Sequence, residues 1–312
     1  MIMNKLIVST AAFGALAAVS VPAHAADRQG WQRVGTGMTG GVSGIALVAG
    51  APVRHDRADV VIVHDNKNDG ETRIETVRLR PGKAPVTTPL SWNGPLPKDV
   101  EALDAVPGLA NHYIALASEG TAYHVVVAGR TATVVGTPVP LPDRQAGDNY
   151  EGFALYRGPV GRLFAVWATR GKNDQKAVIR TAPADAGRTR FGLGATADTE
   201  RFAVPFPNED EVRHVSDLKV LRDGTVLVSS ASDPNDNDGP FSSAVYQAGR
   251  LTIKSRLRPV LRLKESLRPL RRYTKQDDRK VEAIVALPGG QALWGTDDEN
   301  NGGSVTFDRL HH

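Results

Sequence analysis

Acidic or small polar residues recur at one place in five segments of the sequence. In each segment the residue opens a short apolar stretch, and a more hydrophobic second stretch follows after a turn and ends in polar residues. The first set of positions is Ser43, Glu101, Glu151, Asp217 and Glu282, and the second set is Asp65, Glu119, Thr169-Arg170, Ser232-Asp233 and Asp297-Asp298. If the four carboxylates of the first set converge, either some of them are protonated or a cation neutralises their repulsion.

Calcium is the cation that these residue types favour, because it is hard and takes six to eight oxygen ligands. The sequence has no cysteine and no histidine cluster, which argues against zinc or copper. We therefore expect a calcium site made by Glu101, Glu151, Asp217 and Glu282. The alternative is structural, in which these acids bond to backbone amides of a neighbouring sheet and lock the sheets together.

Four further residues are candidates for catalysis. Lys67 and Arg170 follow the second apolar stretches, where a cation beside calcium would suit an anionic group that bridges both. His64 and His214 adjoin the same positions, and either could serve as a general base. Solvated loop lysines and arginines, and histidines that only form hydrogen bonds, are the alternatives. The sequence contains no G-x-S-x-G, no H-E-x-x-H and no cysteine nucleophile.

The elements that would position these residues are short strands. Residues of the first set stand 58, 50, 66 and 65 positions apart, which is room for four strands and their loops in each repeat. Because two successive strands run antiparallel, the start of the first and the end of the second lie at the same end of a sheet. In a β-propeller, where the first strand of each blade lines the channel, both sets would therefore gather around one mouth.

The two ends of the repeat indicate how the ring closes. The last copy stops after its third strand, Ser304–Phe307, and an unassigned strand, Trp31–Gly35, precedes the first copy. We expect this N-terminal strand to complete the last blade, which removes two exposed sheet edges. The sequence thus predicts an all-β, five-bladed propeller; a six-bladed ring and a β-sandwich are the alternatives. Residues 263–280 fit no blade, and we expect a short helical insertion there, interrupted at Pro269.

The N-terminal residues are typical of a signal peptide. Lys5 precedes an apolar run from Leu6 to Val21, and Ala23-His24-Ala25 forms an A-x-A cleavage site. We expect residues 1–25 to be removed and residues 26–312 to form a single domain, periplasmic or secreted and monomeric. No second apolar stretch is long enough to span a membrane.

The positive charge of the chain is concentrated in one segment. The net charge is +4, but residues 250–280 carry twelve Lys or Arg against three acids, so this segment is +9 and the remainder −5. Apart from Tyr273 the segment has no aromatic residue for stacking on bases, and we expect no nucleic-acid partner. A small anionic ligand or substrate is the partner that the candidate site implies.

Two copies of the repeat carry a resemblance to known proteins. Asp99-Val100-Glu101-Ala102-Leu103, with Ile114–Glu119, and Asn149–Ala154 are similar to the strand pairs of secreted phytase-like and esterase-like β-propellers. The resemblance implies a propeller fold and a calcium-assisted hydrolase of phosphate esters or related esters. The sequence departs from that pattern at Ser43, where an acid is expected, and the basic catalytic residues of phytases have no counterpart that can be placed. A binding or scaffolding propeller without catalysis is the second hypothesis.

Overall fold

The computed structural model describes residues 30–208, 210–234 and 237–310. The predicted signal peptide, residues 1–25, lies outside the described residues. In the part of the chain that is described, no helix has the length and apolar character needed to cross a membrane.

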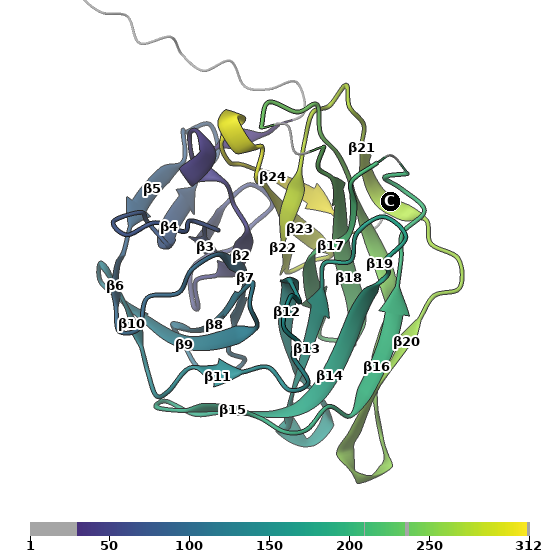
Figure 1. The fold of residues 1–312 in the computed structure, drawn as a ribbon. Helices are drawn as coiled ribbons and strands as arrows, with labels where there is room; N and C mark the ends of the chain where they lie inside the picture. The colour runs from purple at the N-terminus through teal and green to yellow at the C-terminus, as the bar shows by residue number, and fades with distance from the viewer. Residues whose placement is uncertain (1–29, 209, 235–236, 311–312) are drawn as a thin grey trace, which may run out of the picture.

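Five sheets, antiparallel except for the parallel pair β6–β10, are arranged around a central axis as the blades of a propeller (Figure 1). The inner strands β2, β7, β12, β17 and β22 each contact the inner strands of the two neighbouring blades, which closes the ring. Blade 1 contains β2 (Gly44–Leu47), β3 (Ala58–Val63), β4 (Ile74–Leu79) and β5 (Val86–Pro89). Blade 2 contains β7 (Val100–Ala105), β8 (His112–Ala117), β9 (Thr121–Ala128), β10 (Thr131–Val134), β6 (Ser91–Asn93) and β11 (Val139–Pro140).

The other three blades follow in chain order. Blade 3 contains β12 (Tyr150–Arg157), β13 (Leu163–Thr169), β14 (Ala177–Ala186), β15 (Phe191–Leu193) and β16 (Asp198–Phe202). Blade 4 contains β17 (Val212–Val220), β18 (Thr225–Ser232), β19 (Ser242–Lys254), β20 (Arg258–Leu263) and β21 (Pro269–Tyr273). Blade 5 contains β22 (Val281–Leu287), β23 (Gln291–Thr296), β24 (Ser304–Arg309) and β1 (Gln32–Arg33). The described helical turns are the 3₁₀ turns η1 (Met38–Gly40), η2 (Pro159–Gly161), η3 (Ser255–Leu257) and η4 (Glu299–Asn301).

The N-terminal strand closes the last blade. β1 pairs antiparallel with β24, with Gln32 opposite Val305 and Arg33 opposite Ser304. This arrangement confirms the predicted five blades and the predicted closure, and the six-bladed ring and the sandwich are wrong.

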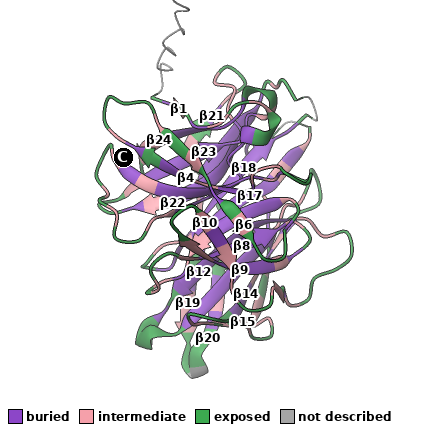
Figure 2. Cartoon of the chain, turned by 90° about the vertical axis from the view of Figure 1, so that its left-hand side faces the viewer, coloured by how far each residue is buried: buried purple, intermediate pink, exposed green. Residues whose placement is uncertain are grey.

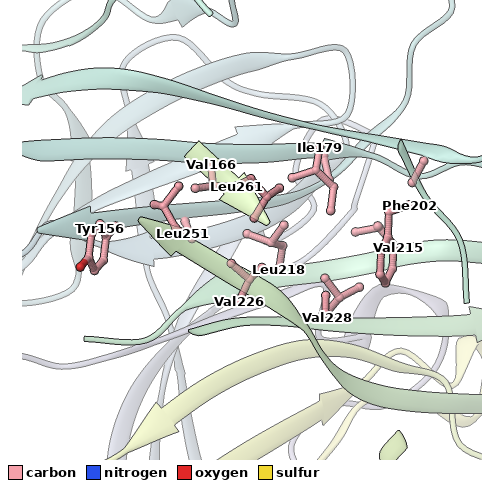
Figure 3. Packing of buried hydrophobic residues seen from close by; sticks show 14 of the residues in the cluster. Tyr156, Val166, Ile179, Phe202, Val215, Leu218, Val226, Val228, Leu251 and Leu261 are labelled. Atoms are coloured by element: carbon pink, nitrogen blue, oxygen red, sulfur yellow. The ribbon is translucent and has the colours of Figure 1, made fainter. Parts of the chain in front are cut away.

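An apolar layer fills each of the five gaps between neighbouring blades. Along β3, Val60 and Ile62 face blade 5, whereas Val61 and Val63 face blade 2. Alternate side chains of a strand point to opposite faces, so a strand covered on both faces is apolar throughout. Figure 3 shows the layer between blades 3 and 4, and Figure 2 shows how much of the inner sheet surface is buried.

Small residues allow the inner strands to approach closely. A Cβ atom added at Gly44 would lie 2.7 Å from the backbone nitrogen of Leu103 in blade 2. One added at Gly152 would lie 2.7 Å from the Cβ of Leu218 in blade 4. The inner strands of neighbouring blades therefore meet at positions where a larger side chain has no room.

The predicted helical insertion at residues 263–280 is wrong. The segment contains the end of β20, the outer strand β21 and the loops on either side of β21: β20 pairs with the second half of β19, and β21 pairs with its first half. In β20 the side chains of Pro259 and Leu261 are buried while Arg258 and Arg262 are exposed, which is the alternation of a strand. Pro269 is the first residue of β21, a position at which proline is tolerated in a sheet.

Candidate functional site

Three inner strands carry a glutamate at a β-bulge near their first residue. The pairing register shifts by one residue at Glu101, Glu151 and Glu282, so that each is the extra residue of its strand. A bulge leaves the extra residue out of the ladder and re-aims its side chain. All three glutamates are buried. We call the end of the propeller at which the inner strands begin the acidic end.

Blade 4 differs at this position. When Val215-Ser216-Asp217-Leu218 is set against Val281-Glu282-Ala283-Ile284, Ser216 takes the place of the glutamate and Asp217 that of the small residue. Asp217 accepts hydrogen bonds from the backbone N–H groups of Leu218 and Ile284, both at 2.7 Å. It therefore ties blade 4 to blade 5, as the structural alternative expects, and we do not retain it as a metal ligand.

The acidic cluster consists of Asp65, Asp99 and Glu101, whose ligand oxygens all lie within 4.8 Å of one another. Asp65 follows β3, Asp99 directly precedes β7, and both are partly exposed while Glu101 is buried. Ser118 Oγ donates to Asp99 Oδ2 at 2.6 Å, and Lys67 Nζ lies 3.1 Å from Asp99 Oδ1. The cluster contains Glu101, which the sequence predicted as a metal ligand, and it contacts Lys67, which the sequence predicted as a catalytic residue.

Burial and mutual repulsion disfavour the ionised forms of two members of the acidic cluster. Burial, with the nearby Asp297, raises the pKa of Asp65 to about 7 despite the opposing charge of Lys280. Burial, with Glu151 and Asp65 next to it, holds the pKa of Glu101 well above its usual range. A bound cation would relieve the same repulsion that a proton relieves.

Arg213 and Lys280, the cationic pair, neutralise the side of the acidic end formed by blades 4 and 5. Arg213 forms ion pairs with Glu282, at 3.1 Å, and with Asp233. The buried Lys280 Nζ lies 3.3 Å from Asp233, 3.5 Å from Asp297 and 3.6 Å from Glu282, and it also contacts Glu299. Burial lowers the pKa of each cation, but the surrounding carboxylates outweigh it and raise both pKa values.

Glu151, in blade 3, lies between the acidic cluster of blades 1 and 2 and the cationic pair of blades 4 and 5. Its carboxylate is 3.5 Å from Arg170 Nη1, and the same oxygen, Oε1, has no hydrogen-bond partner within the described residues. Burial raises the pKa of Glu151, although Arg213 and Arg170 act in the opposite direction. Burial likewise raises the pKa of Glu282, against the effect of Lys280 and Arg213.

The two predicted histidines are not members of the acidic cluster. His64 Nδ1 donates to the carbonyl of Gly41 at 2.6 Å, and its ring lines a cavity of about 540 Å³ beside β1 and η1. His214 Nε2 donates to the carbonyl of Asn173 at 2.7 Å, and its Nδ1 accepts from the N–H of Val204 at 3.4 Å. Burial lowers the pKa of both rings, so both are neutral near pH 7.

Asp99, Arg213 and Lys280 also belong to the site, although the repeat did not predict them. Asp99 and Lys280 each stand directly before the first residue of an inner strand, and Arg213 is the second residue of β17. The signal that could have found the first two is their shared place, one residue before Val100 and Val281. Glu119, which the repeat placed in the second set, is exposed and is not part of the cluster.

No protein-family model matches the sequence, and no curated protein is detectably similar to it. Solved structures of similar fold include a thermostable family-43 glycoside hydrolase, at 12% identity, with a TM-score of 0.49 over 89% of this chain and 92% of that one. The Bacteroides ovatus xyloglucan PUL protein GH43B is 14% identical, with a TM-score of 0.44 over 89% of this chain and 60% of that one. A GH43 β-xylosidase/α-arabinofuranosidase from a compost metagenome is 10% identical, with a TM-score of 0.39 over 85% and 91%. Likeness at this level does not bear on chemistry, and the fold stands on the sheet topology alone.

Proposed function

We propose that the protein is a calcium-assisted hydrolase of phosphate esters or related esters, acting at the acidic end of the propeller. The observation that carries this proposal is the acidic cluster, in which Asp65, Asp99 and Glu101 offer three carboxylate oxygens within 4.8 Å of one another at a partly exposed position. Export, which residues 1–25 predict, would bring the cluster into contact with calcium outside the cytoplasm.

The spacing of these oxygens fits a cation. Ligands that share one calcium ion at 2.3–2.6 Å stand a few ångströms apart, and carboxylates are its preferred ligands. The acidic end also has more carboxyl groups than cations: Asp65, Asp99, Glu101, Glu151, Asp233, Glu282 and Asp297 outnumber Lys67, Arg170, Arg213 and Lys280 by seven to four, so all seven could ionise together only with a further cation.

The roles of the protein groups follow from their charge and position. Calcium held by Asp65, Asp99 and Glu101 would polarise a phosphoryl or carbonyl oxygen and activate a water molecule. Lys67, next to the cluster, would steady the anionic part of the substrate. Glu151, whose raised pKa favours its protonated form, is the acid available to protonate a leaving group.

Thermal unfolding with excess calcium and with a chelator tests the metal site. A ligand that binds only the native state stabilises it by about 2.7 kcal/mol at a hundredfold excess over Kd, which is a rise in Tm of about 5 °C. We expect this rise in the wild type, and we expect it to be lost in Glu101→Gln but kept in the matched control Glu119→Gln. A Tm that is indifferent to calcium would remove the metal from the proposal.

Hydrolysis is tested with a panel of aryl phosphates, aryl esters and aryl glycosides, each with calcium and with a chelator. We expect turnover of a phosphate or carboxylic ester that depends on calcium and falls by about 10²-fold or more in Glu151→Gln. Stabilisation by calcium without turnover of any substrate class would favour the second hypothesis, a binding propeller. Turnover of glycosides alone would contradict the ester assignment.

A further inference from the structure

The hairpin β19–β20 carries two basic cross-strand pairs on one face, separated by the pair Thr252–Val260. In the register of the two strands, Lys254 stands opposite Arg258, and Arg250 stands opposite Arg262. Because side chains alternate along a strand, these four side chains share one face, which we call the basic face. Leu251 and Leu261, on the other face, are buried in the apolar layer between blades 3 and 4 (Figure 3).

The basic face is almost without compensating charge. Arg250 makes an exposed ion pair with Asp223 at 3.4 Å, while Lys254, Arg258 and Arg262 have no carboxylate partner among the described residues. Like charges directly opposite each other destabilise an antiparallel pair. This arrangement therefore weakens the hairpin in isolation, and a partner with negative charge would relieve the repulsion.

The hairpin projects from the end of the propeller opposite the acidic end. β18 begins at Thr225, which pairs with Arg250, whereas β19 continues past it to Lys254. In Figure 2 the exposed turn of this hairpin extends beyond the rest of blade 4 at the lower end of the molecule. The turn itself carries Leu257, an exposed apolar side chain flanked by the basic face. The molecule thus has an acidic end and, opposite it, a basic extension with an apolar tip.

We propose that this hairpin docks the protein on an anionic lipid surface, with the basic face against the headgroups and Leu257 at their boundary with the acyl chains. Each Lys or Arg near such a surface contributes about 1 kcal/mol, and a short apolar insertion adds to this attraction. The acidic end would be repelled by the same surface and would face away from it, so the proposed catalytic site stays open to solution. Docking stands independently of the proposed hydrolase function.

A lipid surface suits these residues better than a nucleic acid. A two-stranded ribbon can enter a major groove, but the hairpin has no aromatic side chain between Tyr246 and Tyr273 for stacking. The exposed Leu257 at the tip could bury its side chain at the boundary between headgroups and acyl chains, whereas a groove lined by phosphates offers no apolar surface to cover it.

Binding to vesicles tests the docking surface. The full-length chain is mixed with vesicles of phosphatidylcholine alone and of phosphatidylcholine with phosphatidylglycerol, and the bound fraction is measured by sedimentation at several salt concentrations. Neutral vesicles report any binding by the N-terminal segment, which every variant shares. We expect stronger binding to the anionic vesicles, weakening as salt increases.

The test variant is Arg258→Gln with Arg262→Gln, and the matched control is Lys98→Gln with Lys176→Gln, two exposed lysines at the acidic end. At about fivefold for each cation removed, the test variant should bind anionic vesicles about 25-fold more weakly, whereas the control should bind like the wild type. Leu257→Ser should weaken binding without changing its salt dependence. Equal binding by the test and control variants overturns the proposal, as does binding to a DNA duplex that needs Arg258 and Arg262 while anionic vesicles are ignored.

Discussion

At the scale of single residues, the acidic end contains two different solutions to the same electrostatic problem. On the side of blades 4 and 5, the ammonium group of Lys280 lies within 4 Å of Asp233, Asp297 and Glu282, at the centre of a set of oxygens. On the side of blades 1 and 2, no buried cation takes this position within the described residues, and the acidic cluster pairs only with the exposed Lys67. A single protein thus provides its own buried cation in one half, and in the other half the proposed calcium ion would play that part.

The raised pKa of Asp65 predicts that the proposed calcium site depends on pH. A carboxyl group whose pKa is about 7 in the native state and 3.8 in the unfolded chain binds more protons when folded, so the free energy of unfolding decreases as pH rises between about 4 and 7. Calcium binds the ionised form, so its stabilising effect should increase over the same range. We expect the rise in Tm caused by calcium to be larger at pH 8 than at pH 5. A rise that is independent of pH would show that Asp65 is not a ligand.

Asp217 shows the limit of what the sequence repeat could predict about the site. The repeat correctly indicated that Glu101, Glu151 and Glu282 occupy equivalent places. In blade 4, however, the bulge contains two extra residues. The carboxylate at the expected spacing, Asp217, therefore lies at the position that contacts blade 5. A bulge changes which way the side chains of a strand point without changing the residue types of that strand. Spacing alone therefore could not show that Ser216, and not Asp217, takes the position of the glutamates. Arg213 and Lys280 were missed because a cation among carboxylates has no motif of its own.

At the scale of elements, the blades were predictable and the outer strands of blade 4 were not. The first two strands of each blade are short apolar stretches at regular spacing, a pattern that burial on both faces imposes. In residues 263–270, Leu263, Leu267 and Leu270 follow the period of a helix, yet the long strand β19 offers an open edge along its whole length. Pairing with that edge determines the structure, and a local sequence pattern contains no information about it.

The close packing of inner strands predicts the effect of one added methyl group. Gly44→Ala would place a Cβ 2.7 Å from the backbone of blade 2, and overpacking of this kind costs about 1–3 kcal/mol. Gly192→Ala is the matched control, because its Cβ would meet no atom within 4 Å. We expect denaturant unfolding to show the loss in Gly44→Ala only. Equal stability of the two variants would contradict the proposed contact between β2 and β7.

At the scale of the whole molecule, ring closure depends on a very short N-terminal strand and on the residue before it. Trp31 is buried between blades 4 and 5, where its ring packs edge-on against Tyr273, with centroids 5.6 Å apart. Trp31→Ala should cost about 3–5 kcal/mol of unfolding free energy and loosen the closure of blade 5. Trp92→Ala, at a half-buried tryptophan in blade 2, should cost less. Hydrogen exchange in β24 reports the closure, and unchanged protection there in Trp31→Ala would contradict this role.

The pairing of Gln32 with Val305 also constrains when the protein can be finished. The two residues are 273 positions apart, so the first strand of the described residues pairs with the last one. Until β24 has been synthesised, blades 1 to 4 can form only an open arc, and β1 has no strand with which to pair. Blade 5, and with it the ring, can therefore be completed only after all the other blades have been synthesised.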